Sequence, residues 1–319
     1  MDRFEGRLAV VTGAGSGMGR ELVRQLAAEG CSVAGCDIDG EAMAETVRLA
    51  EKEARPGVRL TGHVCDVSDE AAVERFRDEV LAQHETDHVN LLFNNAGVGG
   101  GGSFLNDPRE VWERTFAICW GGVYACTRVF MPLLVAADAA HLVNTSSVNG
   151  FWAMLAPGIP HTAYSAAKFA VKGFSEALLE DLRLNAPHVK VSVVMPGHIG
   201  TDIVSNSRKV HGAAAALDAD GIAQARAELA QRGLPVDSMD DDAVRSMVDM
   251  VGDLFRDSAP TSAAEAVAEI LDGVRADRWR ILVGDDARVL DEHVRADPEG
   301  AYEPGGPGLG GLGFVGEAS

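Results

Sequence analysis

The sequence predicts an α/β fold built on a doubly wound parallel sheet, in a single domain with a helical lid after the sixth strand. Over the first two hundred residues, short runs of apolar and β-branched residues alternate with longer segments of helical pattern. A glycine-rich turn directly follows the first of these runs. Repeated strand–helix units imply right-handed crossovers and a parallel sheet with helices on both faces.

Six short runs are expected to form the strands: residues 8–12, 32–37, 58–64, 89–94, 141–146 and 190–195. The segments between them are expected to be helical, over about 19–29, 41–52, 70–83, 109–134 and 163–184. The hydrophobic fraction of 46% and the charged fraction of 24% are ordinary for a folded chain, so general disorder is excluded.

Beyond Pro196 and Gly197 the character of the chain changes. Residues 198–262 are rich in Ala and Asp and are expected to form the lid. One helical face there carries Val244, Met247, Val248, Val251, Leu254 and Phe255. Ser262 and Glu265 have the spacing of a capping box for a helix that runs to about Arg275.

Residues 280–283 are expected to form the last strand, so that the domain spans residues 1–285. The remainder, 286–319, is assigned to a C-terminal tail, which is dominated by Gly and Pro from Gly300 onward. Leu309, Leu312 and Phe314 are scattered through it. Such a composition predicts an extended segment that is either mobile or draped on a neighbouring subunit.

The balance of charge excludes two classes of function. The chain has 28 Lys and Arg residues against 48 Asp and Glu residues, a formal net charge of -20. Such a surface repels phosphate backbones and anionic lipids, which argues against nucleic-acid binding and against a peripheral membrane role. The alternative interpretation of the charge is simply solubility.

The cysteines indicate a reducing compartment. The five are Cys31, Cys36, Cys65, Cys119 and Cys126; they form no CxxC pair and show no metal-ligand spacing, so we expect no metal site. The odd count and the lack of a secretory leader fit the cytoplasm. No apolar run approaches the ~20 residues that span a bilayer. The sequence therefore predicts a soluble, cytoplasmic chain.

The glycine-rich turn lies where a dinucleotide would bind. Glycines let the backbone turn sharply and approach a pyrophosphate, whose charge then lies at the N-terminus of the next helix. A small-residue turn without a ligand would look similar, but its place between the first strand and the first helix favours binding. The candidate residues are Gly13, Ser16, Gly17, Met18 and Gly19.

Asp37 ends the second predicted strand, 24 residues after Gly13. A carboxylate at this place can accept hydrogen bonds from both hydroxyls of the adenosine ribose and would repel a 2′-phosphate. No Arg or Lys occurs in the turn before Gly19 or just after Asp37. The sequence therefore favours NAD over NADP, with a solvated loop carboxylate as the alternative.

Tyr164 and Lys168 are four residues apart on a helical segment, so both side chains share one face. The phenol normally titrates near ~10. A nearby ammonium favours the phenolate and moves the pKa of Tyr164 toward neutral pH. Ser146 and Ser147 end the fifth strand, at the edge where doubly wound sheets bind ligands, and a hydroxyl there could hold a substrate oxygen. A surface Tyr–Lys pair and a serine that satisfies its own turn are the alternatives.

Taken together, these motifs resemble the short-chain dehydrogenases/reductases, which have a Rossmann fold. The matching features are the glycine spacing after the first strand, Asn94-Asn95-Ala96-Gly97 after the fourth, Ser147, Tyr164 with Lys168, and Pro196-Gly197 after the sixth. They occur in the family's order over roughly residues 6–202. The glycine spacing is similar to the compact branch of the family.

The resemblance implies roles for these residues. Tyr164 would be the general acid/base, Lys168 would lower its pKa and bind the nicotinamide ribose, and Ser147 would orient the substrate oxygen. The adenine would contact Asp66 and Val67, and Asn95, with Ala96 and Gly97, would lie against the cofactor. Ile199 and Thr201 would hold the nicotinamide carboxamide.

One position departs from the family pattern. The family has an Asn on the helix after the fourth strand, which anchors a water that relays protons to the Lys, and alignment puts Cys119 there. A thiol is a weak donor and acceptor. We expect an active enzyme with a modified relay, in which Cys119 is a packed helix thiol; a nucleophilic cysteine is the alternative.

Two apolar segments bear on the substrate. The loop between Ser147 and Tyr164 is longer than in many relatives and carries Phe151, Trp152, Met154, Leu155, Pro157, Ile159 and Pro160. With the lid it suggests a bulky hydrophobic alcohol or ketone, although both could equally pack on the body or fill a subunit interface. Gly99–Gly102 is expected to be flexible and to move with the cofactor, or to be a permissive linker.

The sequence thus predicts an NAD-dependent oxidoreductase that moves a hydride between the nicotinamide and a secondary alcohol or ketone. The alternative is a non-catalytic dinucleotide-binding sensor or scaffold with the same fold. The resemblance also implies a homodimer or homotetramer, formed through the helices at 109–134 and 163–184.

Overall fold

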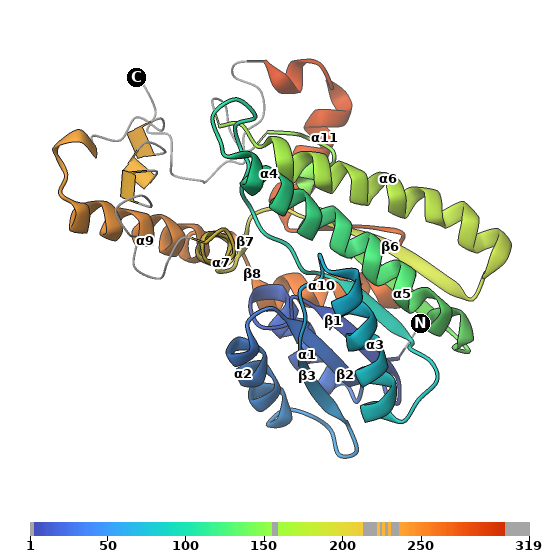
Figure 1. The fold of residues 1–319 in the computed structure, drawn as a ribbon. Helices are drawn as coiled ribbons and strands as arrows, with labels where there is room; N and C mark the ends of the chain where they lie inside the picture. The colour runs from blue at the N-terminus through green and yellow to red at the C-terminus, as the bar shows by residue number, and fades with distance from the viewer. Residues whose placement is uncertain are drawn as a thin grey trace.

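The computed structural model describes residues 3–154, 159–212, 222–223, 225–226, 229–230 and 236–303. Its centre is a parallel sheet of seven strands in the order β3-β2-β1-β4-β5-β6-β9 (Figure 1). The strands are β1 (Leu8–Thr12), β2 (Ser32–Asp37), β3 (Leu60–Val64), β4 (Leu91–Asn94), β5 (Ala140–Thr145), β6 (Val189–Pro196) and β9 (Arg280–Val283). The predicted doubly wound sheet is confirmed.

Burial explains the composition of the strands. Every residue of β1, β4 and β5 is buried, because helices cover both faces of the central strands. In the register, Val10 of β1 pairs with Ala34 of β2 on one side and with Leu92 of β4 on the other. Strand β3, at one edge of the sheet, is only partly buried.

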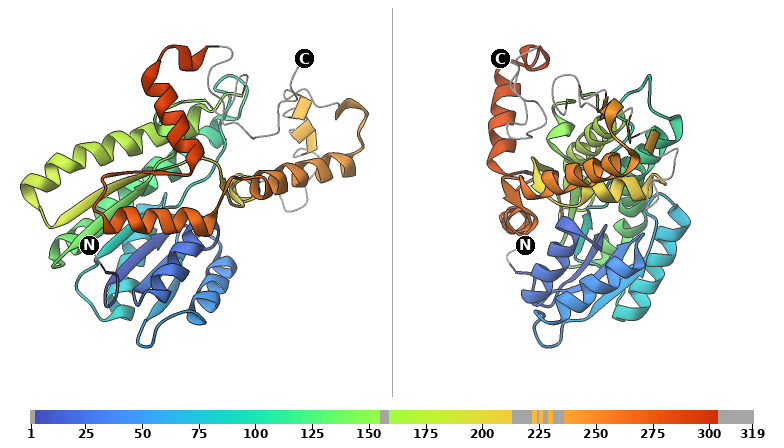
Figure 2. Two further views of the ribbon diagram at one scale, coloured as in Figure 1. Left: turned by 180° about the vertical axis from the view of Figure 1, so that it is seen from behind. Right: turned by 90° about the vertical axis from the view of Figure 1, so that its left-hand side faces the viewer.

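Two helical layers enclose the sheet (Figures 1 and 2). One consists of α1 (Gly17–Ala28), α2 (Gly40–Glu51) and α10 (Ala263–Arg275), and its core includes Leu26 and Ile270. The other contains α3 (Glu70–His84), α5 (Gly122–Ala136) and α6 (Thr162–Asn185), with Phe76 and Phe130 in its core.

The helix predicted over 109–134 is interrupted. It divides into α4 (Arg109–Phe116), a π-helical turn at Ala117–Gly121, and α5. A π turn contains an extra residue, and such turns often occur at functional sites. The expectation that no apolar run approaches the length of a membrane span is wrong for Arg109–Ala136, which is long and apolar enough to cross a bilayer. Because 56% of its most apolar window is buried inside the fold, the stretch is typical of a core helix.

The segment predicted to form the lid, residues 198–262 (the lid segment), is joined to the body through a short two-stranded sheet, β7 (Ile199–Gly200) with β8 (Thr261–Ser262). Helix α7 (Ile203–Val210) follows β7, and α9 (Asp241–Asp257) precedes β8; both lie to one side of the main sheet (Figure 1). Val244 and Val248 of α9 belong to a small separate core with Ile222, Ala225 and Leu229. The predicted capping box between Ser262 and Glu265 is present at the start of α10.

The folded body continues beyond residue 285, so the predicted start of the tail at residue 286 is too early. Helix α11 (Asp285–Ala296) and a short 3₁₀ turn at Gly300–Tyr302 pack on the body. The indole of Trp152 donates to the Ala301 carbonyl at 2.9 Å, and the amide of Ala153 donates to the Tyr302 hydroxyl at 3.0 Å. The predictions for Leu309, Leu312 and Phe314 lie outside the described residues.

The same contacts show that part of the apolar loop after Ser147 packs on the body, which the sequence left open against a substrate pocket or a subunit interface. Trp152 is fully buried, and it packs with Phe151 and Met154 against α11. These three side chains therefore pack on the body, as one of the alternatives predicted. Leu155 and Pro157 lie outside the described residues, while Ile159 is partly buried and Pro160 is exposed.

Candidate functional site

The order of the strands reverses between β1 and β4, and the predicted site residues gather at the carboxyl edge on either side of this switch point. The glycine-rich turn follows β1, Asn95 follows β4, Ser147 follows β5 and Gly197 follows β6. Crevices at this position are where doubly wound sheets bind ligands. The topology alone thus brings together segments that are far apart in the sequence.

The turn after β1 is possible only with glycine at critical positions. Gly13 has a φ of +63°, and a Cβ there would lie 2.7 Å from the Cα of Ala96. A Cβ on Gly19 would lie 1.9 Å from the Gly13 carbonyl oxygen. Ser16 is the N-cap of α1, and its side chain does not cap the helix. The first amides of α1 therefore face a backbone cradle suited to a phosphate.

Asn95 holds this turn from the neighbouring strand. Its side-chain amide donates to the carbonyl oxygens of Thr12 at 3.1 Å and Gly13 at 3.3 Å. In return, the Thr12 hydroxyl accepts from the backbone amides of Asn95 and Ala96 at 3.0 and 3.1 Å. Asn95 and Thr12 therefore position the cradle, and Thr12 was not identified from the sequence as part of it.

Asp37 lies against the turn at the end of β2. Its Oδ2 accepts from the Gly15 amide at 2.8 Å, and its Oδ1 accepts from the Asp39 amide at 3.0 Å. Arg20, which the sequence did not single out, donates to the Gly15 carbonyl at 2.5 Å and to the Thr46 hydroxyl at 3.0 Å. The sequence feature that could have identified Arg20 as part of the turn was its position directly after Gly19. The backbone amide and the backbone carbonyl of Gly15 are thus both hydrogen-bonded to side chains, those of Asp37 and Arg20.

Asp66 and Val67 follow β3. Burial opposes ionisation of Asp66, but hydrogen bonds from Arg114 and Ser68 outweigh it and lower the pKa of the carboxyl. The Arg114 guanidinium lies 2.6 Å from Asp66 Oδ2. Val67 is buried against Gly122, where an added Cβ would come within 2.6 Å of it. Asp66 is therefore a fixed carboxylate beside the cradle.

The structure distinguishes the two serines that end β5. The Ser146 hydroxyl is buried and donates to the Lys168 carbonyl at 2.8 Å, so Ser146 joins α6 to the sheet. The Ser147 hydroxyl accepts from the Asn149 amide at 3.1 Å and forms a hydrogen bond with Tyr164. Ser147 is therefore the serine placed beside the phenol.

Lys168 lies one helical turn from Tyr164 and is buried. Its Nζ donates to the Thr145 carbonyl at 2.8 Å and lies 5.3 Å from the centroid of the Tyr164 ring. Burial lowers the pKa of Lys168, because desolvation disfavours the ammonium. The hydrogen bond to the Thr145 carbonyl thus holds the ammonium of Lys168 close to the ring of Tyr164.

The expected fall in the pKa of Tyr164 is not seen in this structure. Burial raises the pKa of the phenol, and the hydrogen bond with Ser147 opposes this only in part. The physical reason is that desolvation penalises the phenolate, while the desolvated Lys168 is itself shifted toward its neutral form.

Cys119 lies in the π-helical turn at the position predicted to depart from the family pattern. The buried thiol donates to the Val98 carbonyl at 3.2 Å and accepts from the Val98 amide at 3.4 Å. A Cβ on Gly97 would lie 3.5 Å from Lys168 Nζ and 3.7 Å from Cys119 Sγ, so the thiol and the ammonium flank Gly97. The expectation of a packed thiol agrees with these contacts.

Beyond β6, the lid segment reaches back to the glycine-rich turn. Thr201 lies against Gly17, where a Cβ would be 3.1 Å from its Cγ2, and Ile199 is buried in the core of the sheet. The side-chain amide of Asn206, on α7, donates to the Ser16 hydroxyl at 3.0 Å. The sequence carried no signal for this contact, because it joins residues 190 positions apart.

Gly99–Gly102 is held in place by the lid segment and by α6. The Gly99 amide donates to the Ser207 hydroxyl at 2.7 Å, and His211 Nε2 lies 2.7 Å from the Gly99 carbonyl. The carbonyls of Gly101 and Gly102 accept from the amides of Ala163 and Thr162 at 3.0 Å each. The stretch therefore connects the lid segment to the start of α6.

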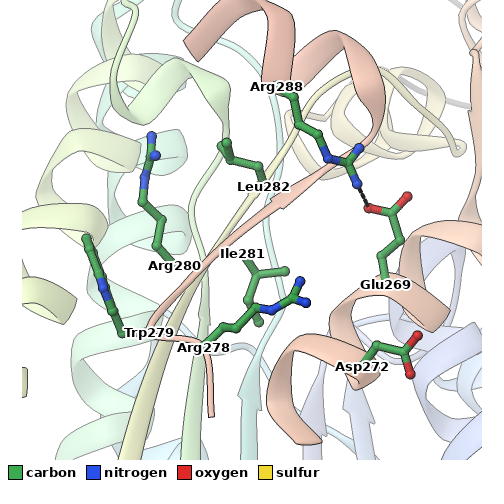
Figure 3. Close-up of a pocket in the computed structure, with 8 residues that line it drawn as sticks. All are labelled: Glu269, Asp272, Arg278, Trp279, Arg280, Ile281, Leu282 and Arg288. Carbon is green, nitrogen blue, oxygen red and sulfur yellow. Dashed lines mark hydrogen bonds and ion pairs between the residues drawn. The ribbon is translucent and has the colours of Figure 1, made fainter. Parts of the chain in front are cut away.

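Other features lie away from this site. His198 Nε2 bonds to the Phe255 carbonyl at 2.7 Å and thereby anchors α9, and the described ranges hold no cluster suited to a metal. A cavity of about 480 Å³ follows the exposed edge of β9, with Trp279 and Arg280 on one side of the strand and the ion pair between Arg288 and Glu269 on the other (Figure 3).

Comparison with known proteins agrees with this geometry. Residues 7–212 match the family model of the short chain dehydrogenases. The chain is 38% identical over 212 residues to the Mycobacterium tuberculosis protein SadH, which carries the name of an oxidoreductase; the match covers 66% of this chain and 74% of SadH. Human epidermal retinol dehydrogenase 2 is 34% identical over 198 residues, or 61% of each protein.

Solved structures show the same fold. A short chain dehydrogenase/reductase from Burkholderia phymatum, in complex with NAD, superposes with a TM-score of 0.75 at 28% identity and covers 96% of this chain and 99% of its own. A metagenomic short-chain oxidoreductase in complex with NADP has a TM-score of 0.54 at 32% identity, over 61% of this chain and 83% of its own. Relatives thus include complexes with either dinucleotide.

Proposed function

Because the chain belongs to the short-chain dehydrogenase family, we propose that it is an NAD-dependent oxidoreductase that interconverts a secondary alcohol and a ketone. The observation that carries the proposal is the convergence of Ser147, Tyr164 and Lys168 at the carboxyl edge of the sheet, beside the glycine-rich cradle. A protein that only binds a dinucleotide does not require the hydrogen bond between Tyr164 and Ser147 at this position.

The residues present fit a dinucleotide. Gly13, Ser16, Gly17, Met18 and Gly19 would hold the pyrophosphate at the N-terminus of α1. Asp66 and Val67 would contact the adenine, Asn95, Ala96 and Gly97 would lie along the cofactor, and Ile199 with Thr201 would hold the carboxamide. The nicotinamide supplies the hydride-transfer chemistry when it is bound.

The protein's own side chains would handle the proton and the oxygen. Tyr164 gives the hydroxyl proton to the substrate oxygen or takes it, and Ser147 holds that oxygen by a hydrogen bond. Lys168 binds the nicotinamide ribose and favours the phenolate of Tyr164. Because burial raises the pKa of Tyr164, this electrostatic help and the Ser147 hydrogen bond must together offset desolvation during turnover.

Asp37 supports NAD as the cofactor. Its carboxylate is fixed by the amides of Gly15 and Asp39 at the edge of the cradle, where it would accept the adenosine ribose hydroxyls and repel a 2′-phosphate. The Arg20 guanidinium is engaged by the Gly15 carbonyl and the Thr46 hydroxyl. A preference for NAD in turn favours oxidation of the alcohol.

A bulky hydrophobic substrate remains the proposal. The segment after Gly99–Gly102 exposes Phe104 and Leu105, and α9, in the lid segment, exposes Met250. The human relative is named as a retinol dehydrogenase, and retinol is an apolar alcohol.

Assembly and location are part of the same proposal. Tyr124 on α5, and Phe169 and Leu184 on α6, leave apolar surface exposed on the two helices expected to form a homodimer or homotetramer. Five free, buried thiols support the cytoplasm as the location.

The test is thermal unfolding with NADH and with NADPH at equal concentration, followed by turnover of apolar secondary alcohols with the preferred cofactor. A ligand at ~100 times its dissociation constant adds about 2.7 kcal/mol to the free energy of unfolding. Stabilisation by NADH together with turnover is expected. Binding without any turnover would support the second candidate, a dinucleotide-binding sensor, for which the replacement of the relay Asn by Cys119 is the motivating observation.

A further inference from the structure

His161 starts the catalytic helix in direct contact with Tyr164. It is the N-cap of α6, three residues before the tyrosine, so the two side chains share a helix face. Their ring centroids lie 4.7 Å apart, and the ring planes are inclined by 38°. His161 is partly buried.

The imidazole has no hydrogen-bond partner among the described residues, and its side chain does not cap α6. Other enclosed histidines do have partners: His63 bonds to Glu79, His141 to Ser192 and His198 to the Phe255 carbonyl. Desolvation lowers the pKa of His161 to about 4, so the ring is neutral at physiological pH. A neutral imidazole offers one donor and one acceptor.

The backbone and side chain of Thr162, next to His161, are already paired. The Thr162 amide donates to the Gly102 carbonyl at 3.0 Å, and the Thr162 hydroxyl bonds both to the Gly101 carbonyl at 3.2 Å and to the Trp112 indole at 3.1 Å. Among the described polar side chains at the start of α6, the His161 imidazole and the buried Ser165 hydroxyl are left without a hydrogen-bond partner. An imidazole without a protein partner can pair with a ligand.

We propose that His161 is a specificity-determining residue that hydrogen-bonds a second oxygen of the substrate, on the carbon next to the reacting one. The substrates would then be vicinal diols or α-hydroxy ketones on an apolar skeleton. A neutral ring selects a hydroxyl or a carbonyl over a carboxylate, and the net charge of -20 also disfavours anions. This inference rests on the proposed function, because it places the substrate carbinol at Tyr164.

A matched pair of substrates tests it. For the wild type, His161→Phe and His161→Asn, kcat/KM is measured with decane-2,3-diol and with decan-2-ol. A site built to bond a hydroxyl discriminates against the analogue that lacks it. We expect the diol-to-alcohol ratio to fall about tenfold in His161→Phe, mainly through KM for the diol, and to recover in part in His161→Asn.

Two results separate this inference from the proposed function. Equal losses on both substrates, or an unchanged ratio, would overturn the role of His161 and leave the oxidoreductase in place, because the imidazole would then only pack on Tyr164. If the wild type binds NADH but turns over neither substrate, the proposed function is overturned and this inference with it. Thermal unfolding of each variant checks that the fold is intact.

Discussion

The thiol of Cys119 forms a two-way hydrogen bond with the backbone of Val98, donating to its carbonyl at 3.2 Å and accepting from its amide at 3.4 Å. This pair joins the π-helical turn to the segment after β4, across Gly97 from the ammonium of Lys168. An amide side chain could make the same two bonds. The contact explains how a weakly polar thiol can be accommodated in this turn, at the position where the sequence comparison with the family predicts an Asn.

Replacement of Cys119 by Ala should lower both stability and turnover. Loss of the thiol leaves the buried amide and carbonyl of Val98 unpaired, which should reduce the free energy of unfolding by about 1–3 kcal/mol. Cys119→Asn can restore both bonds, so turnover should hold or rise. Cys126→Ala, a change at a buried thiol on the same helical run, is the control and should lower stability without lowering kcat. A collapse of activity in Cys119→Asn would show that the thiol has a chemical role of its own.

Asp37→Asn should weaken the preference for NADH. The neutral amide keeps an acceptor for Gly15 but loses the charge that binds the ribose hydroxyls and repels a 2′-phosphate, so we expect about a tenfold loss of NADH affinity and a relative gain for NADPH. Asp39→Asn, at the N-cap of α2, is the control and should leave the ratio of the two dissociation constants unchanged. Tighter binding of NADPH than of NADH by the wild type would refute the role of Asp37.

His141 should make the protein less stable in acid. Burial lowers its pKa from 6.5 to about 4, although Asp277 acts in the opposite direction. The unfolded chain therefore binds this proton at higher pH than the folded chain, and the free energy of unfolding falls as the pH drops from about 6.5 toward 4, by about 3 kcal/mol at most. Denaturant titrations across this window should show a shallower pH dependence in His141→Gln. An unchanged slope would contradict the assignment; His88→Gln, at a side chain that is 40% exposed, serves as the control.

The sequence was sufficient to predict the parallel sheet and the motifs that lie along its carboxyl edge. Strands such as β1 match their predicted bounds because a buried parallel strand is a continuous apolar run. The carboxyl ends of parallel strands share one edge, so residues that follow different strands could be expected to meet there. Two-residue strands such as β7 are too short to show any periodicity.

What could not be predicted depends on tertiary contacts. The π turn at Ala117–Gly121 depends on hydrogen-bond register, which composition does not encode. The packing of Trp152 on α11 and the bond between Asn206 and Ser16 join distant segments. The raised pKa of Tyr164 likewise depends on how much water its neighbours exclude, whereas its spacing from Lys168 predicted only the opposing effect.

The most direct test of the proposed function compares Tyr164→Phe with Tyr124→Phe. Tyr124 is an exposed tyrosine on α5 that packs beside Trp120 and Phe174, away from the Ser147 hydroxyl. Thermal unfolding with NADH and the rate of alcohol-dependent NADH formation are measured for both variants and for the wild type. We predict that NADH stabilises all three proteins, that Tyr124→Phe turns over normally, and that Tyr164→Phe loses about 10²–10⁴-fold in kcat. Turnover by Tyr164→Phe at the wild-type rate would contradict the assignment of the phenol as the acid/base, and with it the central claim.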